Sequence, residues 1–501
     1  MSEVTRIVED RSLTYYQQLT ALARLAESKD TTINYDPEYR KAIAEHCLCD
    51  LNEGVLPYRP RYIIPRYELL MEKGSEFLGL DVPRDIWEAT NALLIMYHHV
   101  PSITTFPVFL GNIDSLLEPF IDDEEEAKKA IRMFLLHIDK TLTDSFVHAD
   151  IGPGETKAGR IILELTEEMG LAIPNLTLKY DPELTSKNFT QAALKCMLKT
   201  AKPSFANHKM YTEDYGDYVI ASCYNGFYNG GGGYTLPRMI LAHIALKADS
   251  IEDFFDRVLP YYVDLQLGYM DLRIKYLVEE AAFFKSNFLV KEGFIDRKLF
   301  VGMFGLVGLA ECCNNLLKIT DKAQGFGHSQ EADDLGVLIL DKIEEMLKAH
   351  KAPYSEGNND RYYLHAQVGI DTDGDTAAPG CRIPIGYEPP FAKQMKHSTR
   401  YHKLFRTGIG DVFKFDRTWL DSLAAMEDVI KGAFAEGVRY ISGYLEDGDV
   451  VRVTGYLVKR SEIAKLEAGD AVLNQATVFG KGAKDGAKAL DRTVNHESTG
   501  Q

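Results

Sequence analysis

Short apolar runs typical of β-strands alternate with amphipathic helical runs along most of this 501-residue sequence. The run at 172–180 precedes a helical pattern at 188–200, and residues 303–318 read as a strand or buried turn that enters a helix. Such alternation predicts parallel strands joined by crossover helices, which is an α/β fold. No linker rich in Pro, Gly or Ser interrupts the pattern, so we expect one domain over residues 1–501.

Apolar residues at helical spacing predict that residues 1–100 are mainly helical and that helices lie at 124–143 and 155–170. A longer helical tract spans 251–291, and we expect Pro260 to interrupt it because proline lacks the N–H that a helix interior requires. Further expectations are a buried β-segment within 102–114, a helix and a β-like run within 419–449, and a strand with a tight turn at 450–458.

Composition narrows the class of protein. The chain has 56 Lys and Arg residues against 74 Asp and Glu residues, for a net charge of −18, which disfavours binding to nucleic acid backbones. It has no apolar run of the ~18 residues that a membrane span needs, and its N-terminus is polar, without a visible secretory signal. Seven cysteines without a CxxC pair do not form a disulfide framework. We expect a cytoplasmic protein with reduced thiols, without nucleic acid or membrane partners.

One cysteine stands where an apolar strand ends. Cys223 follows the run 218–221 and leads into Asn225 and the glycines at 230–233. A thiol placed there can reach an interior cavity, although a buried cysteine is more often structural. The four glycines either present N–H groups to an anion or let two segments approach closely. They are not a P-loop, because no Lys follows them in the required pattern.

A second feature lies near the carboxyl end, in Arg452-Val453-Thr454-Gly455-Tyr456. Alone, its glycine would mark a bulge or bend in a strand. With Cys223 far upstream, RVTGY resembles the glycyl radical signature, in which Arg-Val, a variable residue and Gly-Tyr lie near the C-terminus. From about residue 100 onward the chain resembles the YjjI-type branch of glycyl radical enzymes, in the stretches PNLTLKY, KPSFANH, ASCYNG…GGGGYTL, HAQVGIDTDGD and RIPIGYEPP and in the tail after Gly455.

The resemblance implies an α/β fold: a ten-stranded barrel of two parallel half-barrels, surrounded by helices, with two loops meeting inside. It makes 440–501 the glycyl radical C-terminal segment. Gly455 would store an α-carbon radical, since glycine has no side chain to oppose a planar centre. Cys223 would carry the radical to substrate as a thiyl, and abstract hydrogen from a small polar metabolite.

Departures from the patterns of known branches narrow the range of reactions that this chain could catalyse. Ser222 precedes the cysteine where the pyruvate formate-lyase branch has a second cysteine, and Asn225 stands where radical dehydratases have a basic Glu. The zinc-ribbon cysteines of anaerobic ribonucleotide reductases are missing between Cys381 and Gly455. The adjacent Cys312 and Cys313 are a rival thiol pair, in a helical run where one would face the core and the other a neighbouring helix.

Two alternatives of another class stay open. A non-catalytic radical carrier, which serves as a spare part for another enzyme, would need Gly455 but not Cys223. A binding barrel would use Gly455 only as a structural glycine. Ribonucleotide-reductase-like or formate-lyase-like chemistry also remains as an alternative reaction for the same radical.

Other polar residues are weaker candidates. We take Asn225, His208 and Glu311 as candidates for a substrate pocket. Acidic residues alternate in IDTDGDT, at Asp371, Asp373 and Asp375, but the position that needs Glu in a calcium loop is an Arg. This segment is interpreted as a solvated turn or as carboxylates that orient substrate hydroxyls, and no metal site is expected.

The resemblance also implies a partner. The chain has no CxxxCxxC motif of a radical S-adenosylmethionine (SAM) enzyme. We therefore expect a separate activase to install the radical with S-adenosylmethionine, while this chain binds no cofactor of its own. A homodimer is compatible with the family. The activated protein would be sensitive to oxygen and would belong to anaerobic metabolism, with lyase or related radical chemistry.

Overall fold

The structure is a computed structural model that describes residues 2–29, 32–51, 53–54, 56–102, 106–144, 146–367, 377–485 and 488–492. Its α-helices are α1 (Glu3–Glu9), α2 (Tyr15–Glu27), α3 (Pro37–Ala44), α4 (Tyr67–Lys73), α5 (Ile86–Tyr97), α6 (Ile113–Leu117), α7 (Glu124–Thr141), α8 (Lys157–Met169), α9 (Lys187–Thr200), α10 (His208–Tyr215), α11 (Leu241–Ala245), α12 (Ile251–Asp253), α13 (Leu259–Glu279), α14 (Phe283–Ser286), α15 (Phe288–Lys291), α16 (Leu309–Leu316), α17 (Gln330–Ala349), α18 (Phe391–His402), α19 (Leu423–Ala435), α20 (Arg460–Glu467) and α21 (Gln475–Asp485).

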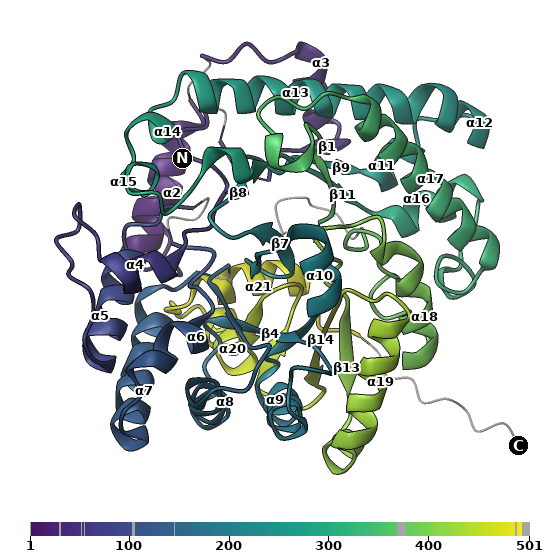
Figure 1. The fold of residues 1–501 in the computed structure, drawn as a ribbon. Coiled ribbons are helices and arrows are strands. Elements are labelled where there is room, and N and C mark those ends of the chain that lie inside the picture. Colours follow the sequence, from purple (N-terminus) through teal and green to yellow (C-terminus); the bar gives the residue numbers. More distant parts are fainter. Residues whose placement is uncertain are drawn as a thin grey trace, which may run out of the picture.

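Short strands lie between these helices. They are β1 (Leu48–Cys49), β2 (Tyr62–Ile63), β3 (His148–Ile151), β4 (Asn175–Tyr180), β5 (Ser204–Asn207), β6 (Tyr218–Ala221), β7 (Asn225–Tyr228), β8 (Gly232–Gly233), β9 (Arg238–Ile240), β10 (Phe300–Val301), β11 (Met303–Val307), β12 (Tyr363–Ala366), β13 (Val412–Phe415), β14 (Tyr440–Leu445), β15 (Val450–Arg452) and β16 (Leu457–Lys459). Figure 1 shows long helices such as α7, α8, α9, α13 and α17 around these strands.

Two runs of parallel strands form the larger sheets. In one sheet β3, β4 and β5 are parallel, β14 pairs antiparallel with β5, and β13 runs parallel to β14. In the other, β9, β11 and β12 are parallel and β1 closes one edge in the opposite direction. Every residue of β3, β4 and β5 is buried, as expected for strands covered by helices on the outside and by loops within.

The helices follow local sequence signals. In α8 the hydroxyl of Thr156 accepts a hydrogen bond from the N–H of Gly159, and Gly170 ends the helix with a left-handed φ of 53°. The helices α7 and α8 confirm the predictions at 124–143 and 155–170. No helix in the described part of the chain is long and apolar enough to cross a membrane.

Two predictions of local structure are wrong. Helical structure continues through Pro260, because a π-helical turn at Phe254–Val258 precedes it and Pro260 stands in the first turn of α13, where its missing N–H costs little. The segment 106–112 is largely buried as predicted but forms no strand, and its β-pairing is limited to an isolated bridge between Asn112 and Asp150, while residues 103–105 lie outside the described residues. Pro107 removes a donor there and Gly111 turns the chain with a φ of 99°.

The glycine run brings segments together. β8 lies between β2 and β10 in a three-stranded sheet. A Cβ on Gly232 would lie 2.1 Å from the carbonyl oxygen of Tyr62, and one on Gly231 would lie 2.4 Å from that of Leu299. Both separations are too short for any side chain, so the prediction of close approach is confirmed.

The C-terminal segment reaches the interior. β15 and β16 form an antiparallel hairpin, and α20 and α21, yellow in Figure 1, follow near the middle of the view. At the start of α21 the N–H of Gln475 donates to the carbonyl oxygen of Thr143, 2.7 Å away. The C-terminal segment is thereby attached, at α21, to the chain just before β3.

Candidate active site where two hairpins meet

Cys223 stands at the tip of a β-hairpin. β6 and β7 pair antiparallel up to Ala221 and Asn225, and the three residues between them form the connection. Ser222 has a left-handed φ of 64°, an uncommon conformation for a residue with a side chain. Its N–H donates to the carbonyl oxygen of Val108 at 3.0 Å, which helps to hold this conformation. Cys223 itself is a free thiol and only 4% exposed.

Gly455 stands in the turn of the second hairpin. β15 and β16 pair up to Arg452 and Leu457, and the N–H of Val453 donates to the carbonyl oxygen of Tyr456 at 3.1 Å. The φ of Gly455 lies outside the left-handed region, so the backbone conformation does not require glycine at this position.

Space requires glycine instead. A Cβ on Gly455 would lie 2.3 Å from Cβ and 2.4 Å from Sγ of Cys223. No side chain fits there, and the α-hydrogen in this direction, the pro-S hydrogen, points at the thiol. The structure thus brings together the two residues that the sequence singled out for radical storage and radical transfer, although they belong to distant parts of the chain.

The carbonyl oxygen of Gly455 accepts two hydrogen bonds. Asn175 Nδ2 donates from 3.1 Å and Arg452 Nη1 from 3.3 Å. Arg452 is buried, and its Nη2 also donates to Asn175 Oδ1 at 3.2 Å and to the carbonyl oxygen of Ala201 at 2.7 Å. From the C-terminal tail, Arg492 donates to the carbonyl oxygens of Arg452 and Val453. The glycine loop is therefore fixed through its backbone oxygens.

The cysteine loop is fixed through its carbonyl oxygens as well. Tyr440 Oη donates to the carbonyl oxygen of Cys223 at 2.8 Å, and His148 Nδ1 donates to that of Ser222 at 3.3 Å. Thr177 Oγ1 lies 2.8 Å from His148 Nε2 and 3.2 Å from Tyr440 Oη, so it joins the two donors. Burial lowers the pKa of His148 to about 3, so its imidazole is neutral.

Burial also sets the protonation state of the thiol. It raises the pKa of Cys223 to about 11, although the Ser222 hydroxyl and the Arg452, Arg382 and Arg61 guanidinium groups favour the thiolate. The S–H bond is therefore intact at neutral pH. A nucleophilic cysteine shows the opposite shift, so this site suits transfer of a hydrogen atom better than attack by a thiolate.

The other predicted residues are dispersed. Asn225 begins β7 and is buried, and its Oδ1 has no hydrogen-bond partner among the described residues. His208 begins α10 and lines a separate pocket at the base of the cysteine hairpin. Glu311 in α16 accepts from the N–H of Ala378 at 3.0 Å. Of these three, Asn225 is the residue that belongs to the hairpin of Cys223.

The rival thiols are placed differently. Cys312 and Cys313 are fully buried in α16, and burial raises both thiol pKa values. Cys313 faces α17, where a Cβ on Gly336 would lie 3.5 Å from its Sγ. The acidic residues Asp371, Asp373 and Asp375 lie outside the described residues. Within the described ranges, no three His, Cys, Asp or Glu side chains are grouped to hold a metal ion.

Comparison with known families identifies the chain. A family model described as glycyl radical enzyme, YjjI-like, matches residues 13–495. The chain belongs to this family. It is 44% identical to an uncharacterized protein of Haemophilus influenzae, with 99% of this chain and 98% of the relative covered. It is 36% identical to the uncharacterized protein YjjI of Escherichia coli, with 98% and 96% covered.

Solved structures with the same fold belong to enzymes that catalyse different reactions. The glycerol-bound B12-independent glycerol dehydratase of Clostridium butyricum matches with a TM-score of 0.70 and 10% identity, over 98% of this chain and 88% of that one. The anaerobic ribonucleotide reductase of Thermotoga maritima with dATP and CTP matches with a TM-score of 0.69 and 12% identity, over 93% and 94%. These matches confirm the fold predicted from the resemblance, but they do not select a reaction.

Sequence reasoning did not single out several residues around this site. Asn175, His148 and Tyr440 come from β4, β3 and β14, and each contacts one of the two loops. Asn175 lies inside the stretch PNLTLKY that carried the family resemblance, and this was the available signal for it. For His148 and Tyr440 the sequence offers no pattern, because all residues of these strands are buried.

Proposed function

We propose that Gly455 stores the radical of this glycyl radical enzyme and that Cys223 transfers it to a small polar metabolite. The contact between the Gly455 α-carbon and the Cys223 thiol supports this proposal most strongly, since any side chain on residue 455 would collide with the thiol. Glycine at this position is required by the space beside the thiol rather than by its φ, and storage of a radical would give that space a purpose.

Asn175 and Arg452 would stabilise the radical electronically. An α-carbon radical between an amide nitrogen and a carbonyl group is delocalised onto both. Donors at the carbonyl oxygen favour the form with negative charge on that oxygen, and a guanidinium donor does so most strongly. The two hydrogen bonds would therefore lower the energy of the radical relative to the intact glycine.

Each step of radical transfer moves one hydrogen atom, so no external oxidant or reductant is needed. The Gly455 radical takes the hydrogen atom of the Cys223 thiol, so a C–H bond forms, the S–H bond breaks and a thiyl remains. The thiyl then takes a hydrogen atom from a substrate C–H bond and restores the thiol. The resulting carbon radical undergoes elimination, cleavage or rearrangement. The product radical then takes a hydrogen atom from the Cys223 thiol, and the thiyl formed takes one from the Gly455 α-carbon, which regenerates the glycyl radical.

The surroundings of the thiol favour some reactions over others. Ser222 Oγ lies 3.7 Å from Cys223 Sγ, where acyl transfer between two thiols would need a cysteine. Asn225 cannot accept a proton from a substrate as a glutamate would. We therefore favour a reaction in which the protein supplies the radical and orients the substrate. Ribonucleotide-reductase-like and formate-lyase-like reactions remain the alternatives.

Members of the family carry a protein-based radical. Here we propose that a radical SAM activase installs it on Gly455, that the enzyme acts in the cytoplasm, and that a homodimer is the working assembly. A non-catalytic radical carrier is the alternative function. It accounts for Gly455 but gives no reason for a buried, protonated thiol in contact with it.

Exposure to air tests the radical position without knowledge of the substrate. Dioxygen adds to a carbon radical, and the resulting peroxyl breaks the backbone there. Activated protein should split at Gly455 into a large fragment that ends near Thr454 and a short one that begins near Tyr456. Unactivated protein should stay intact. Mass spectrometry distinguishes these outcomes, and a cut elsewhere would move the radical from Gly455 and end this proposal.

A further inference from the structure

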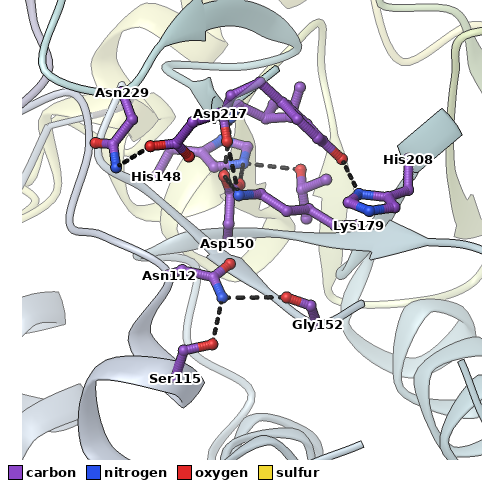
Figure 2. Close-up of polar contacts among 12 residues, drawn as sticks. Asn112, Ser115, His148, Asp150, Gly152, Lys179, His208, Asp217 and Asn229 are labelled. Atoms are coloured by element: carbon purple, nitrogen blue, oxygen red, sulfur yellow. Dashed lines mark hydrogen bonds and ion pairs between the residues drawn. The ribbon is translucent and has the colours of Figure 1, made fainter. Parts of the chain in front are cut away.

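A polar pocket lies at the base of the cysteine hairpin, on the side away from its tip. It has a volume of about 370 Å³ and lies where β3 and β4 end, and where α10 and the hairpin begin. Figure 2 shows the side chains that converge on it. In α/β folds, the carboxyl ends of parallel strands are the usual place for a ligand. Val219 lines the pocket and Cys223 stands four residues later, so this side of the pocket lies within roughly 13 Å of Cys223.

One end of the pocket is cationic. The Lys179 side chain is nine-tenths buried, and its Nζ donates to the carbonyl oxygen of Tyr218 at 2.8 Å. The Asp150 carboxylate forms an ion pair with the same nitrogen at 3.7 Å, which is beyond hydrogen-bond distance, so the ammonium keeps donors for another acceptor. His208 Nδ1 lies 3.1 Å from Tyr218 Oη. If the Tyr218 hydroxyl donates to Nδ1, the proton of the neutral imidazole is on Nε2, and this N–H can donate a hydrogen bond to a ligand.

The other end offers acceptors. Asn229 Nδ2 bonds Glu68 Oε1 at 2.5 Å and Asp217 Oδ2 at 3.1 Å, which fixes two carboxylates beside one amide. The Oδ1 atoms of Asn229 and Asn112 are buried and have no hydrogen-bond partner within the part of the chain that the structure describes, although both side chains line the pocket. These groups complement hydroxyl or ammonium donors on a ligand.

We infer that this pocket is a second binding site, which takes a small hydroxy or amino carboxylic acid. The carboxylate of the ligand bonds Lys179 and His208, and its hydroxyl or ammonium groups bond Asp217 and the Asn229 amide. The charges at the two ends match such a ligand and do not match a neutral polyol or a simple inorganic anion. The site is separate from the radical chemistry proposed above, and it binds without activation.

Three three-carbon probes test the inference on unactivated protein by isothermal titration calorimetry. DL-glycerate has a carboxylate and hydroxyls, L-serine adds an ammonium group, and glycerol lacks the carboxylate. We expect glycerate and serine to bind at least ~10-fold more tightly than glycerol, since a charge-assisted hydrogen bond to Lys179 is lost with the carboxylate. Equal binding of all three, or no binding of the two acids, overturns the inference.

Variants locate the binding. Lys179→Met should weaken glycerate and serine at least ~10-fold. Asp217→Asn changes an exposed residue, so it serves if the buried Lys179→Met variant fails to fold. It should weaken the binding of serine several-fold and leave the affinity for glycerate within about 2-fold, because only serine presents a cation there.

Glu213→Gln in α10 removes the same charge outside the pocket and is the matched control. Unchanged affinity in folded Lys179→Met, or serine and glycerate affected alike by Asp217→Asn, contradicts the assignment. Because no radical is needed, a failure here leaves the proposed function untouched.

Discussion

The two hairpins that meet at the candidate active site are both held through backbone carbonyl oxygens, but they differ in what they contribute and in their local conformation. The glycine hairpin contributes a backbone atom, has an unstrained φ at Gly455, and is held by arginine and asparagine side chains that reach its carbonyl oxygens. The cysteine hairpin contributes a side chain, has a left-handed residue beside the thiol, and is held by His148 and Tyr440.

This difference indicates a division of labour. Donors at the Gly455 carbonyl oxygen act on the atom group that would carry the spin, so they affect how stable the radical is. Donors at the Ser222 and Cys223 carbonyl oxygens lie outside that group and affect only where the thiol stands. Perturbing one hairpin should therefore change the radical itself, and perturbing the other should change only its transfer.

Replacing Gly455 by alanine should have the largest effect. The new Cβ would collide with Cys223, and overpacking of this kind typically costs about 1–3 kcal/mol of stability. A glycyl radical should be absent after anaerobic treatment with a competent activase, and turnover should be lost. Electron paramagnetic resonance (EPR) spectroscopy and thermal unfolding measure the two effects.

The double variant Gly455→Ala with Cys223→Gly controls for the collision. It removes both atoms that the new Cβ would meet, so it should regain much of the lost stability. It should still give no radical. A doublet from either variant that matches the wild-type spectrum would place the radical on another residue.

Removing a donor from the glycine hairpin should come next in size. Asn175→Leu deletes one of the two hydrogen bonds to the Gly455 carbonyl oxygen. We expect a several-fold lower radical yield and a changed doublet splitting, because more spin stays on the α-carbon. EPR at matched activase concentration measures both. A spectrum and yield equal to the wild type would show that the carbonyl donors do not influence the radical.

The matched change in the cysteine hairpin is Tyr440→Phe, which deletes the hydroxyl that donates to the Cys223 carbonyl oxygen. Loss of one such bond costs about 0.5–1.5 kcal/mol, so hydrogen transfer should slow by about 2-fold to 13-fold at most. The EPR spectrum should stay unchanged. If Tyr440→Phe alters the spectrum as Asn175→Leu does, the two hairpins do not divide the work as described.

The smallest expected effect concerns pH. Burial raises the pKa of the Cys223 thiol to about 11, whereas an exposed thiol has a pKa of about 8.5. The protonated thiol, and the stability that this shift contributes, are fully present below the unfolded value and are lost as pH rises through about 11. The rate of hydrogen exchange between Gly455 and solvent should therefore not fall between pH 7 and about 9.5, because the thiol stays protonated over this range. A fall centred near pH 8.5 would mean that the reacting thiol is not buried.

Sequence reasoning reached the two residues proposed to react because each has a local signal. RVTGY is a short motif, and Cys223 ends an apolar strand. The alternation of strands and helices likewise predicted the α/β class. The supporting residues have no such signal, since Asn175, His148 and Tyr440 come from strands buried throughout, where periodicity does not show which side faces a loop. The prediction at Pro260 is wrong because a π-helical turn precedes this proline and places it in the first turn of α13, which periodicity does not reveal.

Exchange of the Gly455 hydrogen with solvent tests the central claim most directly. Activated protein is transferred anaerobically into D₂O, and the EPR doublet from the remaining α-hydrogen is followed over time. With the wild type, the Gly455 radical repeatedly exchanges a hydrogen atom with the Cys223 thiol, so deuterium enters and the doublet collapses. In Cys223→Ser the stronger O–H bond stops this transfer, and the doublet should persist with full intensity. Collapse at the wild-type rate in Cys223→Ser would contradict the contact between radical and thiol on which the account rests.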